Sequence, residues 1–93
     1  MRRVLLLSPG FTRAARRILK KDPEVAPSLQ EALDSLTEDA FQPSLKTHKL
    51  KGGWKGSWAC SAGYDLRIIF DFVQHEGAEA LQVQMVGTHD DVY

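Results

Sequence analysis

The chain has 93 residues, and its 12 Lys plus Arg balance its 12 Asp plus Glu, so the formal net charge is zero. This length predicts one domain over residues 1–93 with a modest core, and a hydrophobic content of 43% excludes a disordered chain. The single cysteine, Cys60, excludes an intramolecular disulfide and gives no reason to expect an oxidising compartment.

The first third of the chain predicts a strand followed by two helices. Residues 2–8 form the strand, and because its centre is apolar on both faces we expect it to be buried. Ser8 is a favourable N-cap and Pro9 fits a first helical turn, so a helix begins there. Apolar residues recur at helical spacing over 11–19 and again over 25–36. Two helices joined by a tight turn predict an antiparallel hairpin.

The rest of the chain predicts a loop, three strands and a tail. Residues 40–51 contain a proline among polar side chains and predict a loop. Alternation with a period of two predicts strands over 58–62, 65–73 and 81–86, and residues 88–93 follow as a short tail. The order β-α-α-β-β-β predicts an α+β fold, with a helical hairpin packed on one face of a mainly antiparallel sheet.

The zero net charge conceals a strong segregation of charge along the chain. Residues 1–21 contain seven bases and no acid, whereas residues 22–39 contain six acids and no base. Four lysines follow within 46–55, and five acids lie within 71–91. A neutral total argues, taken alone, against a nucleic-acid partner. Because an anionic ligand responds to the local field, the neutral total does not exclude RNA.

The sequence lacks the motifs of several other kinds of site. It has no Gly-rich phosphate loop, and its three histidines and one cysteine lack metal-ligand spacing, so we expect neither a cofactor nor a metal. Its apolar runs are too short for a signal peptide or for a membrane span of about 20 residues. We therefore expect a cytoplasmic protein without membrane contact. Cys60 shares a strand face with Trp58 and Ala62, which favours a packed thiol over a nucleophile.

The remaining polar features fit acid–base chemistry on a phosphodiester. In metal-free RNA cleavage a base takes the 2′-hydroxyl proton, a cation stabilises the phosphorane, and an acid protonates the leaving 5′-oxygen. The ordinary alternatives are surface residues: a histidine in a polar loop, or an Asp-x-Arg ion pair on a strand. The candidates are His48 in a lysine-rich loop, Asp65 and Arg67 on one strand face, His89 just past a strand, and the phenol of Tyr93.

Four sequence words, in this order and spacing, resemble the RelE/YafQ toxin superfamily, and its YafQ-like branch most. They are residues 48–52 (HKLKG), 54–56 (WKG), 65–70 (DLRIIF) and 87–93 (GTHDDVY). The resemblance implies a RelE-like, microbial-RNase-like fold and the toxin of a type II toxin–antitoxin pair. It implies an mRNA interferase that cleaves mRNA on the ribosome, leaves a 2′,3′-cyclic phosphate and inhibits translation. It also implies a cognate antitoxin, with operator DNA contacted only through that antitoxin.

The resemblance also suggests a role for each candidate residue. His48 becomes a general base, His89 a general acid or phosphate ligand, and Tyr93 a residue that stacks on a base or positions the leaving group. Asp65 orients groups or shares protons, and Arg67 stabilises the phosphorane. RNA phosphates and bases would be held by Lys46, Lys49, Lys51, Lys55 and Trp54.

Other interpretations stay open. YafQ-like members can have a further histidine where this chain has Ser61. That difference and the zero net charge motivate a second hypothesis, a catalytically weakened module that acts mainly as an antitoxin-binding partner and corepressor. A third, weaker idea is direct DNA binding by the basic first helix. Trp54 fits a stacking role and a core role about equally, whereas a core role is favoured for Trp58.

Overall fold

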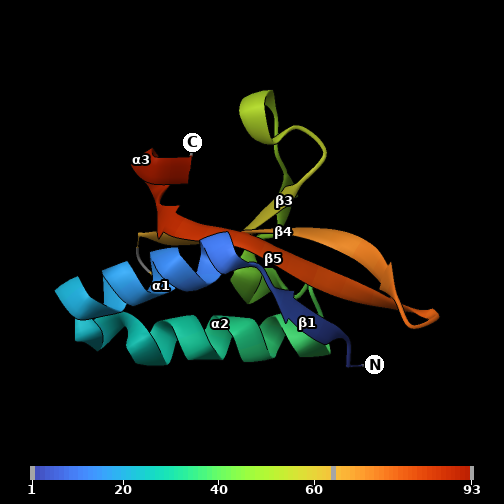
Figure 1. Ribbon diagram of the computed structural model, residues 1–93, viewed down its shortest axis with the longest axis horizontal. Coiled ribbons are helices and arrows are strands. Elements are labelled where there is room, and N and C mark those ends of the chain that lie inside the picture. The colour runs from blue at the N-terminus through green and yellow to red at the C-terminus, as the bar shows by residue number, and fades with distance from the viewer. Residues whose placement is uncertain (1, 64, 93) are drawn as a thin grey trace.

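The computed structural model describes residues 2–63 and 65–92, and its centre is a five-stranded mixed sheet (Figure 1). The strand order is β1-β5-β4-β3-β2, in which β1 pairs with β5 in parallel and every other pair is antiparallel. The strands are β1 (Val4–Leu7), β2 (His48–Lys49), β3 (Trp58–Ser61), β4 (Leu66–His75) and β5 (Ala78–Thr88).

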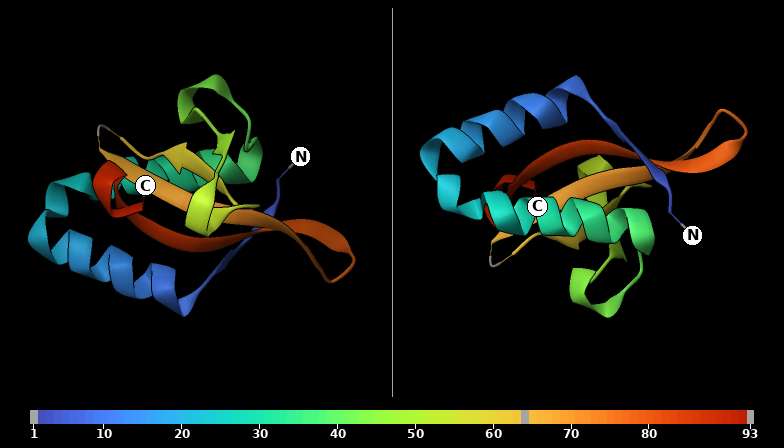
Figure 2. Two further views of the ribbon diagram at one scale, coloured as in Figure 1. Left: turned by 90° about the horizontal axis from the view of Figure 1, so that it is seen from above. Right: turned by 90° about the horizontal axis from the view of Figure 1, so that it is seen from below.

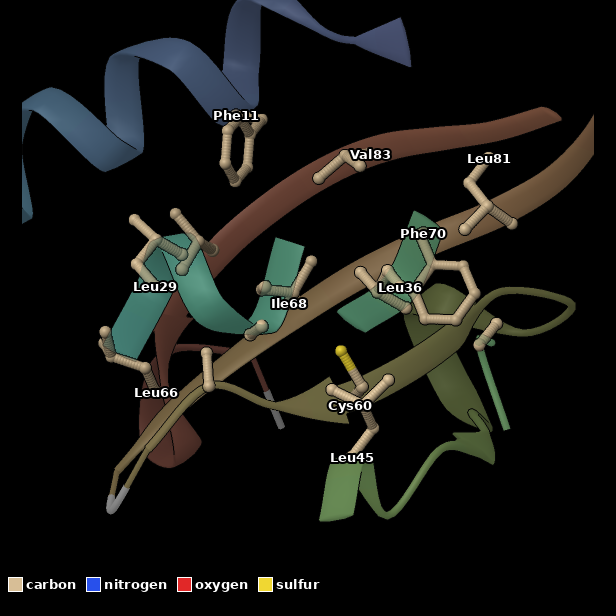
Figure 3. Close-up of a cluster of buried hydrophobic side chains, with 14 of the residues drawn as sticks. Phe11, Leu29, Leu36, Leu45, Cys60, Leu66, Ile68, Phe70, Leu81 and Val83 are labelled. Carbon is tan, nitrogen blue, oxygen red and sulfur yellow. The ribbon is translucent and has the colours of Figure 1, made fainter. Parts of the chain in front are cut away.

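The helical hairpin covers one face of the sheet, as the view from below shows (Figure 2). α1 (Pro9–Lys21) begins at Ser8, whose Oγ accepts the N–H of Phe11 at 3.1 Å and so caps the first turn. The 3₁₀ turn η1 (Pro23–Val25) leads into α2 (Ala26–Glu38). The apolar stripes of both helices pack on β4 and β5, which forms the main core (Figure 3).

The opposite face is covered only in part (Figure 2, left). It is approached by α3 (His89–Val92) from one side and by the segment with β2 and η3 (Gly52–Trp54) from the other. A second, smaller hydrophobic cluster lies between them; we call it the upper cluster, and its buried members are Leu50, Ala59, Ile69 and Val92. This arrangement leaves room for a functional site on the α3 face.

The predicted α+β architecture is confirmed, with three corrections to its elements. β2 lies inside the predicted loop, and the predicted tail contains α3. β1 is not a buried strand: it forms one edge of the sheet, where Val4 is 57% and Leu7 51% exposed. The reason is that the helices cover only one face, so an apolar strand at the edge keeps part of its surface exposed.

The hairpin of β4 and β5 is longer than the alternation predicted. A two-residue turn joins the strands, and both Glu76 (φ 52°) and Gly77 (φ 80°) adopt positive φ, as a tight hairpin requires. One register shift occurs, since Ile69 pairs with Met85 but Phe70 pairs with Val83. Within the described parts of the chain, no helix has both the length and the apolar character needed to cross a membrane.

Candidate active site

The two-residue strand β2 determines which way His48 points. His48 pairs with Ala59 and Lys49 pairs with Trp58 on β3, and directly paired residues share a face of the sheet. Ala59 belongs to the upper cluster, whereas Trp58 packs on the main core. His48 therefore lies on the α3 face. Lys49 lies on the helix-covered face, with its Nζ 5.6 Å from the centre of the Trp58 ring, so it does not join His48.

The backbone before β2 orients the ring of His48. Lys46 ends the 3₁₀ turn η2 (Pro43–Leu45) in the left-handed conformation, with φ 51°. Its carbonyl oxygen lies 3.0 Å from Nδ1 of His48. Because a carbonyl oxygen only accepts, this hydrogen bond requires a proton on Nδ1. In the neutral ring Nε2 then has a lone pair, which is the form that a general base needs.

Reciprocal hydrogen bonds hold α3 against the sheet. The N–H of Thr88 donates to Oδ2 of Asp91 at 3.2 Å, and the N–H of Asp91 donates to Oγ1 of Thr88 at 3.2 Å. This pattern is a capping box. Gly87 lies beneath the helix, and a Cβ there would be only 2.9 Å from the Cβ of Asp91. The helix reaches its position because residue 87 has no side chain.

His89 is the first residue of α3 and is tied to the turn before β4. Its backbone N–H donates to the carbonyl oxygen of Asp65 at 3.1 Å. Its ring is 55% exposed, and Nδ1 lies 4.0 Å from Oδ1 of Asp90. The structure thus joins the backbones of His89 and Asp65.

The upper cluster connects the His48 segment with α3. Leu50 follows β2 and Val92 belongs to α3, and both pack with Ala59 and Ile69. Trp54 is half-buried against the same cluster. Segments about 40 residues apart in sequence therefore meet on one face of the sheet, with His48 at one side of the cluster and His89 at the other.

Arg67 lies between these two segments. It pairs with Ser61 on β3 and with Gly87 on β5, so its side chain is on the α3 face. Its Nη1 donates to the carbonyl oxygen of Leu66 at 2.9 Å. A guanidinium has five N–H donors, and no further hydrogen bond or ion pair of Arg67 occurs among the described residues. The half-buried cation thus retains donors for an anion.

The surface ion pair between Asp65 and Arg67 is not formed. Ion pairs among the described residues join Arg2 to Glu38 and Arg3 to Glu79, and Nδ1 of His89 lies 4.0 Å from Oδ1 of Asp90. Asp65 precedes β4 and is exposed, and it lines a cleft toward the helical hairpin. The strand alternation that was expected to align the two side chains therefore does not include Asp65.

The other predicted RNA contacts are distributed around the site. Lys46, Lys51 and Lys55 are exposed on the segment that contains His48, and Trp54 is half-buried. Tyr93 lies outside the described residues.

Cys60 does not belong to the site. It is fully buried in the main core, as expected of a packed thiol (Figure 3). Burial raises the pKa of Cys60 to about 12, so the thiolate that a nucleophile requires does not form near neutral pH. Among residues 2–63 and 65–92, no group of three His, Cys, Asp or Glu side chains is placed to hold a metal ion.

Sequence reasoning missed the residues that position α3. Gly87 was interpreted as the end of a strand, and Thr88 and Asp91 as part of a short tail, although a threonine followed three residues later by an acid is a known N-terminal helix signal. The glycine gave no separate signal, because its role depends on the close approach of α3 to β5.

Comparisons with known proteins agree on one family. Residues 4–93 match the family model described as "Bacterial toxin of type II toxin-antitoxin system, YafQ". Comparison with curated proteins gave no match.

Several solved structures share the fold. The E. coli DinJ-YafQ toxin-antitoxin complex aligns with a TM-score of 0.76 at 19% identity, over 100% of this chain and 99% of that chain. The YoeB/ParE toxin from Agrobacterium tumefaciens aligns with 0.74 at 15% identity, over 92% and 98%. The YoeB dimer from Staphylococcus aureus aligns with 0.71 at 17% identity, over 96% and 99%. Because the family model spans nearly the whole sequence, the chain belongs to the YafQ family of bacterial toxins of type II toxin–antitoxin systems.

Proposed function

We propose that the protein is an endoribonuclease that cleaves mRNA on the ribosome and so inhibits translation. The observation that supports this most directly is the meeting of the His48 segment and α3 on one face of the sheet, with Arg67 between them. A base, a cation and an acid on one surface are the groups that RNA cleavage without a metal requires.

In this proposal His48 is the general base. The hydrogen bond to the Lys46 carbonyl favours the tautomer with its proton on Nδ1, so Nε2 takes the proton of the 2′-hydroxyl. The 2′-oxygen then attacks the phosphorus, and the bond to the 5′-oxygen breaks. The products are a 2′,3′-cyclic phosphate and a 5′-hydroxyl.

Arg67 and His89 act on the charge that this attack creates. The guanidinium of Arg67 donates to the non-bridging oxygens of the phosphorane. His89, whose ring lies 4.0 Å from the Asp90 carboxylate, gives its proton to the leaving 5′-oxygen. Asp65 orients this group through its backbone bond to His89. Tyr93, which follows Val92 in the sequence, is proposed to stack on a base or position the leaving group.

The RNA backbone is held by the lysines on the His48 segment. Lys46, Lys51 and Lys55 are exposed there, and contacts of this kind give affinity without sequence choice. Trp54 adds a stacking surface. The side chain of Lys49 lies on the helix-covered face of the sheet, so Lys49 is not among the lysines proposed to hold RNA beside His48.

We propose a cognate antitoxin as the protein partner and the cytoplasm as the compartment. The support is family membership and the fold shared with the E. coli DinJ-YafQ complex, which contains an antitoxin. Operator DNA would then be contacted only through the antitoxin.

The test uses purified protein in a translation extract without added metal, with cleavage mapped by primer extension. His48→Ala, Arg67→Ala and His89→Ala should each lower the rate by about 100-fold or more. His75→Ala is the matched control, because His75 ends β4 at the hairpin turn, away from α3. Full cleavage by the first three variants would show that the assigned site is wrong. If the parent protein does not cleave mRNA, the second hypothesis is favoured, in which the protein mainly binds its antitoxin. The observation that supports this second hypothesis is that a serine, Ser61, lies beside Arg67 where related toxins can have a histidine.

A further inference from the structure

A large cleft lies between the helical hairpin and the corner of the sheet that carries Asp65. Its volume is about 770 Å³, and its walls come from α1, η1, α2, the turn before β4, and α3. Pockets that hold small ligands measure about 300–1,000 Å³. Among the described residues with a proposed role in cleavage or RNA binding, only Asp65 lines the cleft.

The floor of the cleft is apolar. Its lining combines the partly buried side chains of Ile18, Val25 and Met85 with the buried core residues Ala14, Leu66 and Val86. Aliphatic walls of this kind suit the flat faces of an aromatic ring, because they remove its surface from water without competing for its polar edge.

The rim on the α1 side is cationic. Arg17 and Lys21 lie one helical turn apart, so both side chains point to the same side of α1, and both line the cleft. Neither forms an ion pair with any described residue. Two exposed cations at this spacing provide donors for a phosphate group.

Three carboxylates also line the cleft: Asp22 directly follows Lys21 at the end of α1, Asp65 precedes β4, and Asp91 belongs to α3. Two of them already accept backbone hydrogen bonds. Oδ1 of Asp22 accepts the N–H of Glu24 at 3.2 Å, and Oδ2 of Asp91 accepts the N–H of Thr88 at 3.2 Å. The carboxylate of Asp65 makes no hydrogen bond or ion pair with a described residue. It remains an acceptor for a hydroxyl or an amino group of a ligand.

The cleft is continuous with the proposed active site through Asp65. This residue lines the cleft, and its carbonyl oxygen accepts the N–H of His89 at 3.1 Å. Thr88, which caps α3, also lines it. His89 and the lining of the cleft are therefore neighbours.

We propose that this cleft binds one nucleotide of the RNA substrate adjacent to the cleaved bond. Its base lies on the apolar floor, its phosphate contacts Arg17 and Lys21, and Asp65 accepts a hydrogen bond from the ribose or from an exocyclic amine of the base. The assignment rests on the proposed endoribonuclease function, and it gives the protein a place where the identity of one base is read.

The test is an NMR titration of the full chain with each of the four nucleoside 5′-monophosphates, and separately with inorganic phosphate. We expect the methyl signals of Ala14, Ile18 and Val86 to shift with a nucleotide. Arg17→Ala/Lys21→Ala should weaken binding by about tenfold or more, since two charge-assisted contacts are lost. Arg16→Ala/Lys20→Ala is the matched control, with the same loss of charge on the same helix and no contact with the cleft.

Three results would overturn the assignment. Equal weakening by both double variants would show a general electrostatic effect. Equal affinity for inorganic phosphate would show an anion site without base recognition, and shifts confined to residues outside the cleft would place the nucleotide elsewhere. His48→Ala/His89→Ala should abolish cleavage but bind nucleotide normally, so a failure of the catalytic proposal is distinguishable from a failure of this one.

Discussion

Gly87→Ala tests whether the position of α3 controls activity separately from stability. The added methyl would be 2.9 Å from the Cβ of Asp91 and 3.2 Å from Cγ1 of Val92, so the helix must move away from the sheet. Full displacement would expose Val92, now 7% exposed, at a cost of about 1.5–3 kcal/mol, and would disrupt a cap worth about 1 kcal/mol. A partial shift of the kind that overpacking produces costs about 1–3 kcal/mol.

We therefore expect the free energy of unfolding to fall by about 2 kcal/mol, whereas the cleavage rate falls by about 100-fold because His89 moves by roughly 1 Å. Urea unfolding followed by tryptophan fluorescence measures the first quantity, and cleavage in a translation extract measures the second. Gly53→Ala is the control, since a Cβ there meets nothing within 4 Å. If the two variants behaved alike in both assays, the close packing of α3 on Gly87 would not be what holds His89.

Three further predictions follow from single side chains. Burial raises the pKa of Cys60 from 9.0 to about 12. Between these pH values the thiol ionises in the unfolded chain but not in the folded one, so the free energy of unfolding is intact below pH 9 and declines toward pH 12. Urea midpoints measured from pH 9 to pH 12 should show this decline in the parent, and Cys60→Ala should remove the contribution of Cys60 to it. Ser8→Ala removes the cap of α1 and should lower the free energy of unfolding by about 1 kcal/mol in the same assay, more than Ser8→Gly. Ser61→His places an imidazole beside Arg67; faster cleavage is expected, and an unchanged rate would mean that Ser61 does not limit activity.

The regular elements could be predicted because their periodicity is long enough to detect. β4 has 10 residues and α1 has 13, long enough for most of each element to show its period. β2 has only two residues and α3 only four, too few for any period to appear. The exposure of β1 was missed for a different reason. An apolar run looks the same in a central strand and in an edge strand, and only the layer of helices decides which face is covered.

The sequence predicts candidate residues for a site, and it does not predict how they are arranged. Treating residues 46–51 as a loop made His48 and Lys49 neighbours in one cationic cluster. Their pairing with Ala59 and Trp58 instead places them on opposite faces of the sheet, because side chains alternate along a strand. If β2 moved by one residue relative to β3, His48 and Lys49 would exchange faces. The register of this two-residue strand therefore decides that His48, and not Lys49, lies on the same face of the sheet as Arg67.

Although the net charge is zero, positive charge is distributed unevenly over the molecule, because ion pairs compensate some of the basic residues and not others. Arg2 and Arg3 form ion pairs with Glu38 and Glu79 at 3.4 and 2.7 Å, so the first two bases of the chain are compensated locally. None of the five bases on α1 has such a partner among the described residues. The uncompensated positive charge is therefore concentrated on α1, beside the cleft, and on residues 46–55, beside His48. Because screening limits the reach of a charge to about 8–10 Å at physiological salt, an anion beside α1 responds to Arg17 and Lys21 and also to the three carboxylates that line the same cleft. An anion beside residues 46–55 responds mainly to the lysines there.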